Sequence, residues 1–267
     1  MRKNRNSRLY TAVGLISCLI ATAFFMFPLV ILVTTSFNNN GFANYVRVFT
    51  KFNLFLNLRT SVIVVGSALI IITLVVSLAA FGFSKLKFKG NHSLYYTLLS
   101  GMMLPSAAII YPLYTIVKML GLVSSPASLI FPYATLSCCY NLMILKNYYD
   151  TIPDEMLEAA TIDGASRFRI WWQIVMPVAK PGMAVVLMQS FLSSWNEVLM
   201  GRIFITDYDQ QPLSVIPLRL AQSVSSRGFP REVMYAALVM CLLPVVIFYC
   251  FAARSLVSGL TAGAIKG

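Results

Sequence analysis

DTIPDEMLEAATIDGASRFRIWWQIVMPVAKPG, residues 150–182, is a charged segment enclosed by long apolar blocks. It opens with a proline and two acids, Pro153–Glu155, which are typical of a helix start because acids complement the positive end of the helix dipole. Met156–Ala160 is rich in helix-forming residues, and Gly164 can adopt the left-handed conformation that ends many helices. The pattern predicts a helix over Pro153–Ile162, about 15 Å long and therefore too short and too charged to span a bilayer.

A second helix is predicted after the glycine, so the segment forms a helical hairpin. Ser166 can cap this helix before it ends near Pro177. Its apolar side is expected to carry Phe168, Trp171, Trp172, Ile174 and Val175. Two roles are compatible with the hairpin. The adjacent Ala159 and Ala160 would let another backbone approach closely, as in a partner's groove, but a short amphipathic helix can also lie on a lipid surface.

The remainder of the chain indicates a polytopic membrane protein. Its 267 residues are 58% hydrophobic and 11% charged, with a mean hydropathy of +0.75, whereas soluble domains average roughly 25% charged residues. The apolar blocks predict an all-α fold, a single membrane domain over residues 1–267, in which residues 151–177 connect the fourth and fifth of six transmembrane helices. The six blocks cover about Leu9–Thr35, Thr60–Ser84, Leu94–Leu120, Ala127–Lys146, Pro181–Ile205 and Glu232–Val257. Five prolines interrupt them, namely Pro28, Pro105, Pro112, Pro132 and Pro244.

The distribution of Lys and Arg predicts the orientation. The two termini and the second and fourth connections hold 13 of these residues, and the opposite side holds the other 8 of 21. The positive-inside rule therefore favours a cytoplasmic location for both termini and for the hairpin. The basic start MRKNRNSR imitates a signal peptide, but the following run, Tyr10–Val33, is too long for one and is interpreted as a retained first helix.

Several classes of function are disfavoured by the composition. The net charge of +12 lies mostly in short connections, where it would set topology and contact anionic lipid headgroups rather than nucleic acid. The five cysteines lie in apolar blocks without metal-ligand spacing, so we predict no metal site. No nucleophile–base set indicates an enzyme. The chain also lacks the GxxxxGK[ST] phosphate loop, so ATP hydrolysis is expected in a separate subunit.

The hairpin resembles the EAA signature of ABC importer permeases. Its motif is Glu158-Ala159-Ala160, three residues, Gly164, nine residues, Ile174, one residue and Met176-Pro177, with methionine where the family usually has leucine, an apolar exchange. The resemblance implies a type I ABC importer fold whose hairpin is the coupling helix, docked into a cleft on a cytoplasmic ATPase. It assigns this coupling to Glu158, Ala159, Ala160, Asp163, Gly164, Ile174 and Pro177.

Other stretches resemble carbohydrate permeases similar to the shorter membrane subunit of the maltose transporter. They are MLPSAAIIYPLYTIVKMLGLVSSPASLIFPY, IPDEMLEAATIDGAS, Trp195-Asn196-Glu197 and the ending GLTAGAIKG. The resemblance implies import of a sugar or oligosaccharide by alternating access across the bacterial plasma membrane. It also implies three partners, namely a second permease forming a heterodimer, an ATPase dimer that holds ATP and Mg, and an extracytoplasmic binding protein. The tail, through Gly259, Thr261 and Gly263, would reach between the ATPases, and residues 206–231 would approach the binding protein.

The substrate pathway has one charged candidate. Glu197 is the one acid well inside an apolar block, and an ionisable group at membrane depth is a functional candidate because its burial is costly. An alternative is that Glu197 lies near the outer interface and pairs with Arg202, with Trp195 as an interface anchor. The candidates for the pathway are Trp195, Asn196, Glu197, Tyr133 and Asn141.

Two further functions remain open. A phosphorylated polyol or another polar solute is an alternative cargo, since the external basic residues would attract an anion. An ion-coupled secondary transporter would need ionisable groups at mid-membrane, and the apolar blocks contain almost none.

Overall fold

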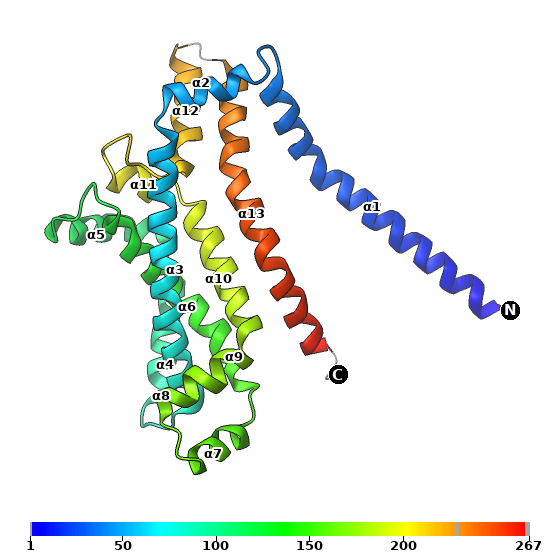
Figure 1. The fold of residues 1–267 in the computed structure, drawn as a ribbon, viewed down its shortest axis with the longest axis vertical. Coiled ribbons are helices and arrows are strands. Elements are labelled where there is room, and N and C mark those ends of the chain that lie inside the picture. Colours follow the sequence, from blue (N-terminus) through cyan, green and yellow to red (C-terminus); the bar gives the residue numbers. More distant parts are fainter. Residues whose placement is uncertain (1, 228–229, 265–267) are drawn as a thin grey trace. The chain divides into compact units, whose positions relative to one another are not determined.

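The computed structural model describes residues 2–227 and 230–264, and it describes side chains over 10–223 and 230–251. In these ranges every regular element is a helix (Figure 1). The chain divides into two compact units. One unit comprises the residues up to Phe52 together with 216–242, and the other comprises 53–215 and the residues from Leu243 onward.

The first unit contains α1 (Arg2–Phe37), α2 (Ala43–Lys51), α12 (Ile216–Arg227) and the start of α13 (Arg231–Ala264). A turn follows α1, with Asn39 and Gly41 at positive φ. The side chain of Asn39 donates to Glu232 of α13 over 2.7 Å. The apolar stretch of α1 is uncovered by the other helices of its own unit. Such a surface is stable only when lipid or another subunit covers it.

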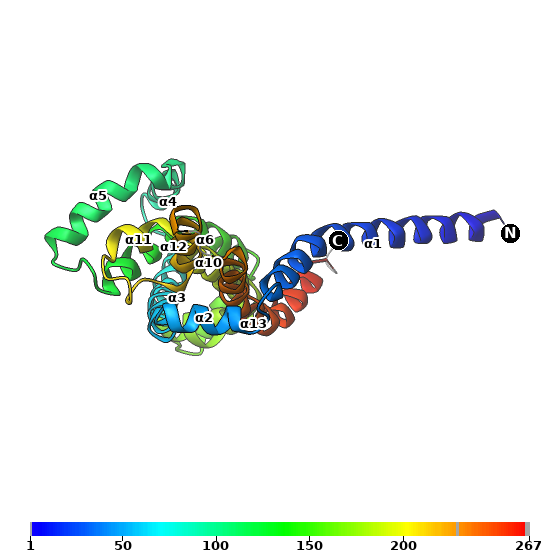
Figure 2. The ribbon, with the colours of Figure 1, turned by 90° about the horizontal axis from the view of Figure 1, so that it is seen from above.

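The second unit is built on α3 (Leu54–Lys85), α6 (Ala127–Asp150) and α10 (Lys180–Trp195), which lie side by side in Figures 1 and 2. Apolar side chains from all three helices form a common buried cluster. The approach of α10 to α6 depends on Gly182, where an added Cβ would lie 2.5 Å from Cγ of Tyr148. The unit also contains α11 (Leu199–Phe204), η3 (Leu213–Val215) and four short helices, α7 (Asp154–Ile162), α8 (Arg167–Ile170), η2 (Trp171–Val175) and α9 (Met176–Val178).

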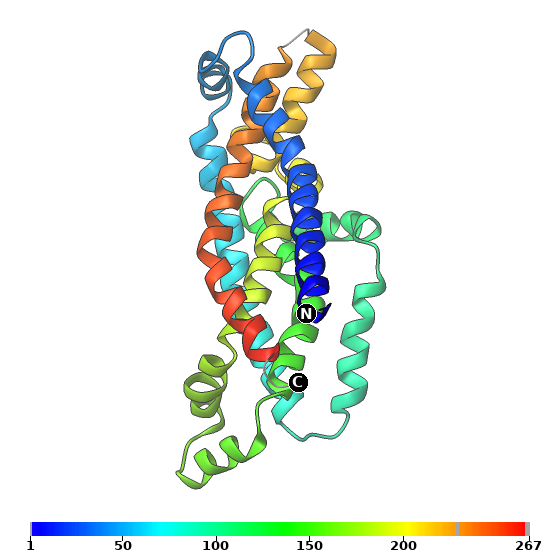
Figure 3. The same ribbon diagram turned by 90° about the vertical axis from the view of Figure 1, so that its right-hand side faces the viewer.

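The third apolar block, predicted over Leu94–Leu120 with interruptions at Pro105 and Pro112, consists of helices that differ in direction. It forms α4 (Asn91–Ser100) with η1 (Gly101–Met103), followed by α5 (Ser106–Met119) at an angle of 101°. Figure 3 shows α4 running along the bundle, and Figures 1 and 2 show α5 leaving it. The break falls at Pro105, because proline holds the residue before it in extended conformation, here Leu104 with φ −77° and ψ 122°.

The other four prolines, Pro28, Pro112, Pro132 and Pro244, lie inside helices that continue past them. The fifth block also differs from the prediction, since α10 ends at Trp195 and residues beyond it begin the separate α11.

Within the described residues the fold contains four candidate membrane spans, or up to six, the predicted number, if each of two bent helix pairs is one span. Four are uninterrupted helices, Tyr10–Phe37, Leu54–Lys85, Ala127–Asp150 and Arg231–Phe251. Two are bent pairs, Asn91–Met103 with Ser106–Met119 and Arg167–Val178 with Lys180–Trp195, the latter bent by 80°.

Candidate functional site

The charged hairpin begins with α7, which forms where the sequence predicts it. Pro153 is extended at its N-terminus, and Asp154 and Glu155 occupy its first turn. Gly164 has a φ of +79°. The N–H of Gly164 donates to the carbonyl of Thr161 and that of Ala165 to the carbonyl of Ala160. These two bonds form a Schellman motif, which ends the helix and turns the chain.

The second helix of the hairpin consists of α8, η2 and α9 in succession. Ser166 caps it by accepting a hydrogen bond from the N–H of Arg169. The predicted apolar side is only partly buried, because Trp171 and Val175 lie in the core whereas Phe168 and Trp172 are exposed. Residues Trp171–Val175 form a π-helical turn, which has more residues per turn than the 3.6 assumed for the predicted face.

The start of α7 is fixed to the end of α3 by a buried lysine. Nζ of Lys85 donates to the carbonyl oxygen of Ile152 over 2.6 Å and to Oδ1 of Asp154 over 2.7 Å. The Lys85 side chain is 5% exposed, and that of Asp154 is 68% exposed. The hydrogen bond from Lys85, and then its charge, hold the pKa of Asp154 below its usual value. Lys85 thus joins two segments that are distant in sequence.

A second set of contacts fixes the end of α6 at the same place. Oγ of Ser84 donates to Oδ1 of Asp150 over 2.6 Å, and Nζ of Lys146 donates to Oδ2 over 2.7 Å. The root of the hairpin is therefore bound to α3 through two consecutive residues, Ser84 and Lys85.

The rest of α7 is largely uncovered. Leu157 is buried and Ala160 is half-buried against the core, but Glu158 and Ala159 are exposed, and Ile162 is 86% exposed. Of the other residues assigned to coupling from the sequence, Asp163, Gly164 and Pro177 are exposed and Ile174 is half-buried.

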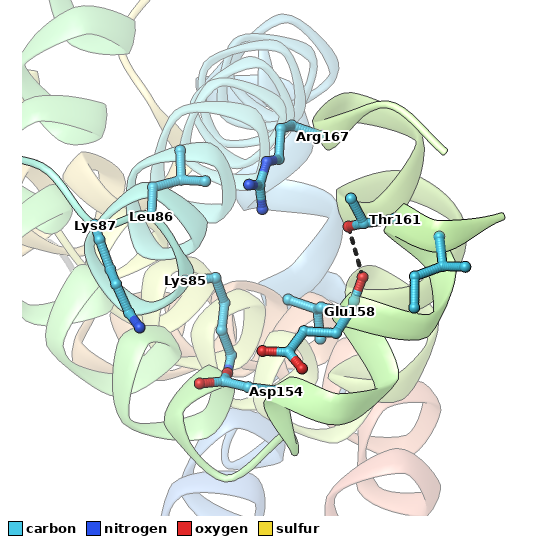
Figure 4. Close-up of a pocket in the computed structure, with 9 residues that line it drawn as sticks. Lys85, Leu86, Lys87, Asp154, Glu158, Thr161 and Arg167 are labelled. Atoms are coloured by element: carbon cyan, nitrogen blue, oxygen red, sulfur yellow. Dashed lines mark hydrogen bonds and ion pairs between the residues drawn. The ribbon is translucent and has the colours of Figure 1, made fainter. Parts of the chain in front are cut away.

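A cavity of about 620 Å³ lies between the end of α3 and the hairpin. Figure 4 shows Lys85 meeting Asp154 on one side of this cavity and Arg167 directed into it. Glu158 lies on the wall that α7 provides, and Lys87 lies on the wall after α3. The cavity is thus lined by exposed residues of α7 together with charged side chains from the end of α3 and from the second helix of the hairpin.

The second candidate region is centred on Glu197, between α10 and α11. Its carboxylate accepts hydrogen bonds from the backbone N–H groups of Met200 and Gly201, so it caps the start of α11. The hydroxyl of Tyr133, on α6, donates to Oε2 over 3.0 Å. Ion pairs of the described residues include none between Glu197 and Arg202, so the alternative considered from the sequence is wrong on this point.

Glu197 and Tyr133 line a cavity of about 310 Å³. Its other polar walls are serines that the sequence interpretation missed, Ser106, Ser137, Ser193 and Ser194. They could have been found only from the packing, because they come from three helices. The remaining candidates lie elsewhere. Trp195 is buried and stacks on Phe191, Asn141 is buried and donates to Ser190, and Asn196 is exposed.

Metal binding and cysteine pairing were also considered. Within the described residues, no group of three or more His, Cys, Asp and Glu side chains could hold a metal ion. All five cysteines are free.

Comparison with known proteins identifies the family. Residues 72–261 match the family of binding-protein-dependent transport system inner membrane components. The diacetylchitobiose uptake system permease protein NgcG of Streptomyces coelicolor is 31% identical over 227 residues, which cover 84% of this chain and 74% of NgcG. The trehalose/maltose transport system permease protein MalG of Thermococcus litoralis is 32% identical over 226 residues, which cover 84% of this chain and 81% of MalG.

The fold is shared with a solved transporter. A chain from a bacterial ABC transporter involved in the import of the acidic polysaccharide alginate superposes with a TM-score of 0.78 and 20% identity, over 94% of this chain and 97% of that one. The family match covers most of the chain, including both candidate regions. The chain therefore belongs to the binding-protein-dependent transport system inner membrane components and is a permease subunit of an ABC transporter.

Proposed function

We propose that this chain is one permease half of a carbohydrate importer, and that α7 is the helix through which a cytoplasmic ATPase drives it. One observation carries the proposal. The root of α7 is held by Lys85 and by the Asp150 contacts, while its exposed residues, including Glu158 and Ile162 beside the 620 Å³ cavity, are left uncovered. A helix that is fixed at one end and exposed over most of its surface is suited to receive a partner.

The charges of α7 favour a protein partner over a lipid surface. The helix carries three acids, Asp154, Glu155 and Glu158, and no basic residue. Helices that lie on membranes are typically rich in Lys and Arg because bacterial and cytoplasmic lipid surfaces are anionic. At 100° per residue, Ile162 lies between Glu155 and Glu158 on the helical wheel. Insertion of this side chain into lipid would therefore carry two carboxylates with it.

The partners follow from this role. ATP and Mg are not expected to bind this chain. They would be held by the ATPase, which would act as a dimer. A second permease would complete the pathway, forming a heterodimer, and an extracytoplasmic binding protein would deliver the cargo. Both termini and α7 would face the cytoplasm, in agreement with the count of Lys and Arg. The tail contacts proposed for Gly259, Thr261 and Gly263 involve side chains outside those that the structure describes.

The proposed cargo is a sugar or oligosaccharide. Relatives are named for uptake of diacetylchitobiose and for transport of trehalose and maltose. The cavity at Glu197 supports this class, because serine hydroxyls, a tyrosine hydroxyl and a carboxylate can exchange hydrogen bonds with sugar hydroxyls. Its volume of about 310 Å³ lies at the lower end of the range for small-molecule sites. A phosphorylated polyol is less suited to this cavity. The one charged residue that lines the cavity is Glu197, which would repel a phosphate group.

The mechanism is alternating access. Closure of the ATPase dimer on ATP would displace α7, and the helices attached to its root would move with it. The pathway between the two permeases would thereby open on one side and close on the other. ATP binding and hydrolysis occur outside this chain, which supplies attachment, motion and part of the pathway wall.

The test uses the assembled importer in proteoliposomes, with uptake of radiolabelled maltose, trehalose and diacetylchitobiose measured alongside ATP hydrolysis. Glu158→Lys should lower the amount of sugar moved per ATP by about tenfold, because a reversed charge on the docking face disfavours the partner. Lys89→Glu, a charge reversal at an exposed residue outside α7, serves as the control. Normal coupling in Glu158→Lys would refute the docking role of α7. Uptake that continued without ATP and collapsed with an ion gradient would instead indicate a secondary transporter.

A further inference from the structure

Lys85 is an unusual residue for the end of a membrane-spanning helix. Its neighbours Lys87 and Lys89 are exposed, as expected for basic residues near lipid headgroups, but the Lys85 side chain is 5% exposed. Burial of an ammonium group is costly unless hydrogen bonds and an opposite charge compensate it. Both acceptors of Lys85 belong to the connection that leads into α7, the carbonyl of Ile152 and the carboxylate of Asp154.

Both acceptors lie at the start of α7, where the backbone and the first side chain are free to bond outside the helix. Ile152 precedes Pro153, and α6 has already ended at Asp150. Asp154 is the first residue of α7, where a carboxylate also complements the helix dipole. One ammonium group therefore ties the last residue of α3 to the beginning of α7. It does so beside the 620 Å³ cavity, while elsewhere buried side chains of the hairpin and of α3 belong to one apolar cluster.

We propose that Lys85 is a positioning residue that passes the displacement of α7 to α3, so that the two helices move together during transport. The proposal rests on the docking role of α7 proposed above. The adjacent bond from Ser84 to Asp150 holds the end of α6 at the same point. A displacement of α7 consequently reaches both central helices of the bundle at their cytoplasmic ends, without passing through the second helix of the hairpin.

The central variant is Lys85→Met, which keeps the length of the buried stem but removes the charge and both hydrogen bonds. Lys85→Arg retains the charge and can still donate to both acceptors. Lys89→Met is the matched control, since it removes an exposed lysine from the same connection. Each variant is measured in the assembled importer for its content of ATPase subunits, for ATP hydrolysis and for maltose, trehalose or diacetylchitobiose moved per ATP.

Lys85→Met is expected to retain its ATPase subunits and its ATP hydrolysis while moving about fivefold less sugar per ATP. This magnitude corresponds to loss of a hydrogen bond between charged groups, whose energy is reduced because Asp154 is exposed to solvent. Lys85→Arg and Lys89→Met should couple normally. Asp154→Asn, an exposed isosteric change, should reproduce part of the defect and gives a reading even if Lys85→Met does not insert. The exchange variant Lys85→Glu with Asp154→Lys should recover part of the coupling that Lys85→Glu alone loses, because it restores the charge pair but not the hydrogen bond to the carbonyl of Ile152.

Normal coupling in both Lys85→Met and Asp154→Asn would overturn the proposal. A purely structural role would appear as less inserted protein with a normal ratio of sugar to ATP, and this result would also overturn it. The two proposals fail separately. If Glu158→Lys uncouples the importer but Lys85→Met does not, α7 docks and the link through Lys85 is wrong.

Discussion

Gly164 allows the geometry of the hairpin to be tested by changing the backbone alone. Its φ is +79°, and a Cβ added to it would meet no atom within 4 Å. Substitution by alanine therefore introduces conformational strain without a clash. The left-handed conformation costs an ordinary residue roughly 1–2 kcal/mol, less for asparagine and more for a β-branched side chain. We expect the coupling ratio to fall in the order Gly, Asn, Ala, Val.

The magnitude follows from the strain. A cost of about 1–2 kcal/mol lowers the population of the observed hairpin end by roughly fivefold to thirtyfold relative to competing conformations. Gly121, in the turn between α5 and α6, provides a matched control because its φ is +69° and its surroundings are equally open. Gly121→Ala and Gly164→Ala should lower the thermal stability of the purified importer by similar amounts. Only Gly164→Ala should lower the sugar moved per ATP in proteoliposomes.

Two results would refute this reasoning. Equal loss of coupling in both alanine variants would show that strain acts on the whole chain rather than through the hairpin. A Gly164→Val variant that couples as well as Gly164→Asn would show that the left-handed turn is not needed.

Three other measurements test the structure. Gly182→Ala should destabilise the importer by about 1–3 kcal/mol, because its Cβ would overlap Tyr148, whereas Gly82→Ala, with open surroundings, should be neutral or stabilising by up to ~1 kcal/mol in thermal unfolding. Glu197→Ala should cost about 1–2 kcal/mol through loss of the cap of α11 and should reduce sugar uptake; unchanged uptake would remove Glu197 from the pathway. The pKa of Asp154 is lowered from 3.8 by the hydrogen bond and charge of its lysine partner, so its stabilising contact is present above about pH 4 and is lost as the pH falls through the lowered pKa. The difference in melting temperature between the wild type and Asp154→Asn should accordingly be constant from about pH 5 to 8 and should vanish in stronger acid.

The hairpin was largely predictable because its signals are local. The first helix was expected over Pro153–Ile162 and is observed over Asp154–Ile162, followed by the predicted glycine turn and the Ser166 cap. Proline, acids, glycine and serine act on residues within one turn of themselves, so the sequence around them is sufficient.

The bent spans were not predictable in the same way. Hydropathy measures whether a block is apolar, and it contains no information on the direction of successive helices. Pro105 was recognised as an interruption, as were four other prolines, yet only Pro105 separates two helices. An α-helix can continue through proline when its neighbours satisfy the freed carbonyl, and that condition depends on the packing.

The side-chain partners were the least predictable feature. Lys85 was counted only as a determinant of topology, because its acceptors lie 67 and 69 residues further along the chain. Trp195 was a candidate for the substrate pathway, with an interface anchor as the alternative, and in the structure it is buried and stacks on Phe191 one helical turn earlier. The sequence identified residue types capable of such interactions, whereas the fold determined which of them meet.

The two candidate regions are connected by one continuous helix, and this connection has a mechanical consequence. Tyr133 and Asp150 both belong to α6, 17 residues apart, a separation of about 26 Å at ~1.5 Å per residue. The helix has no break between them, so a rotation of roughly 10° at the Asp150 end would move the Tyr133 end by about 4–5 Å over this length. Such a shift exceeds the tolerance of the hydrogen bond between Tyr133 and Glu197. In contrast, α5 is separated from α4 at Pro105 and need not follow, so displacement of the hairpin root would move one wall of the serine-lined cavity relative to the other.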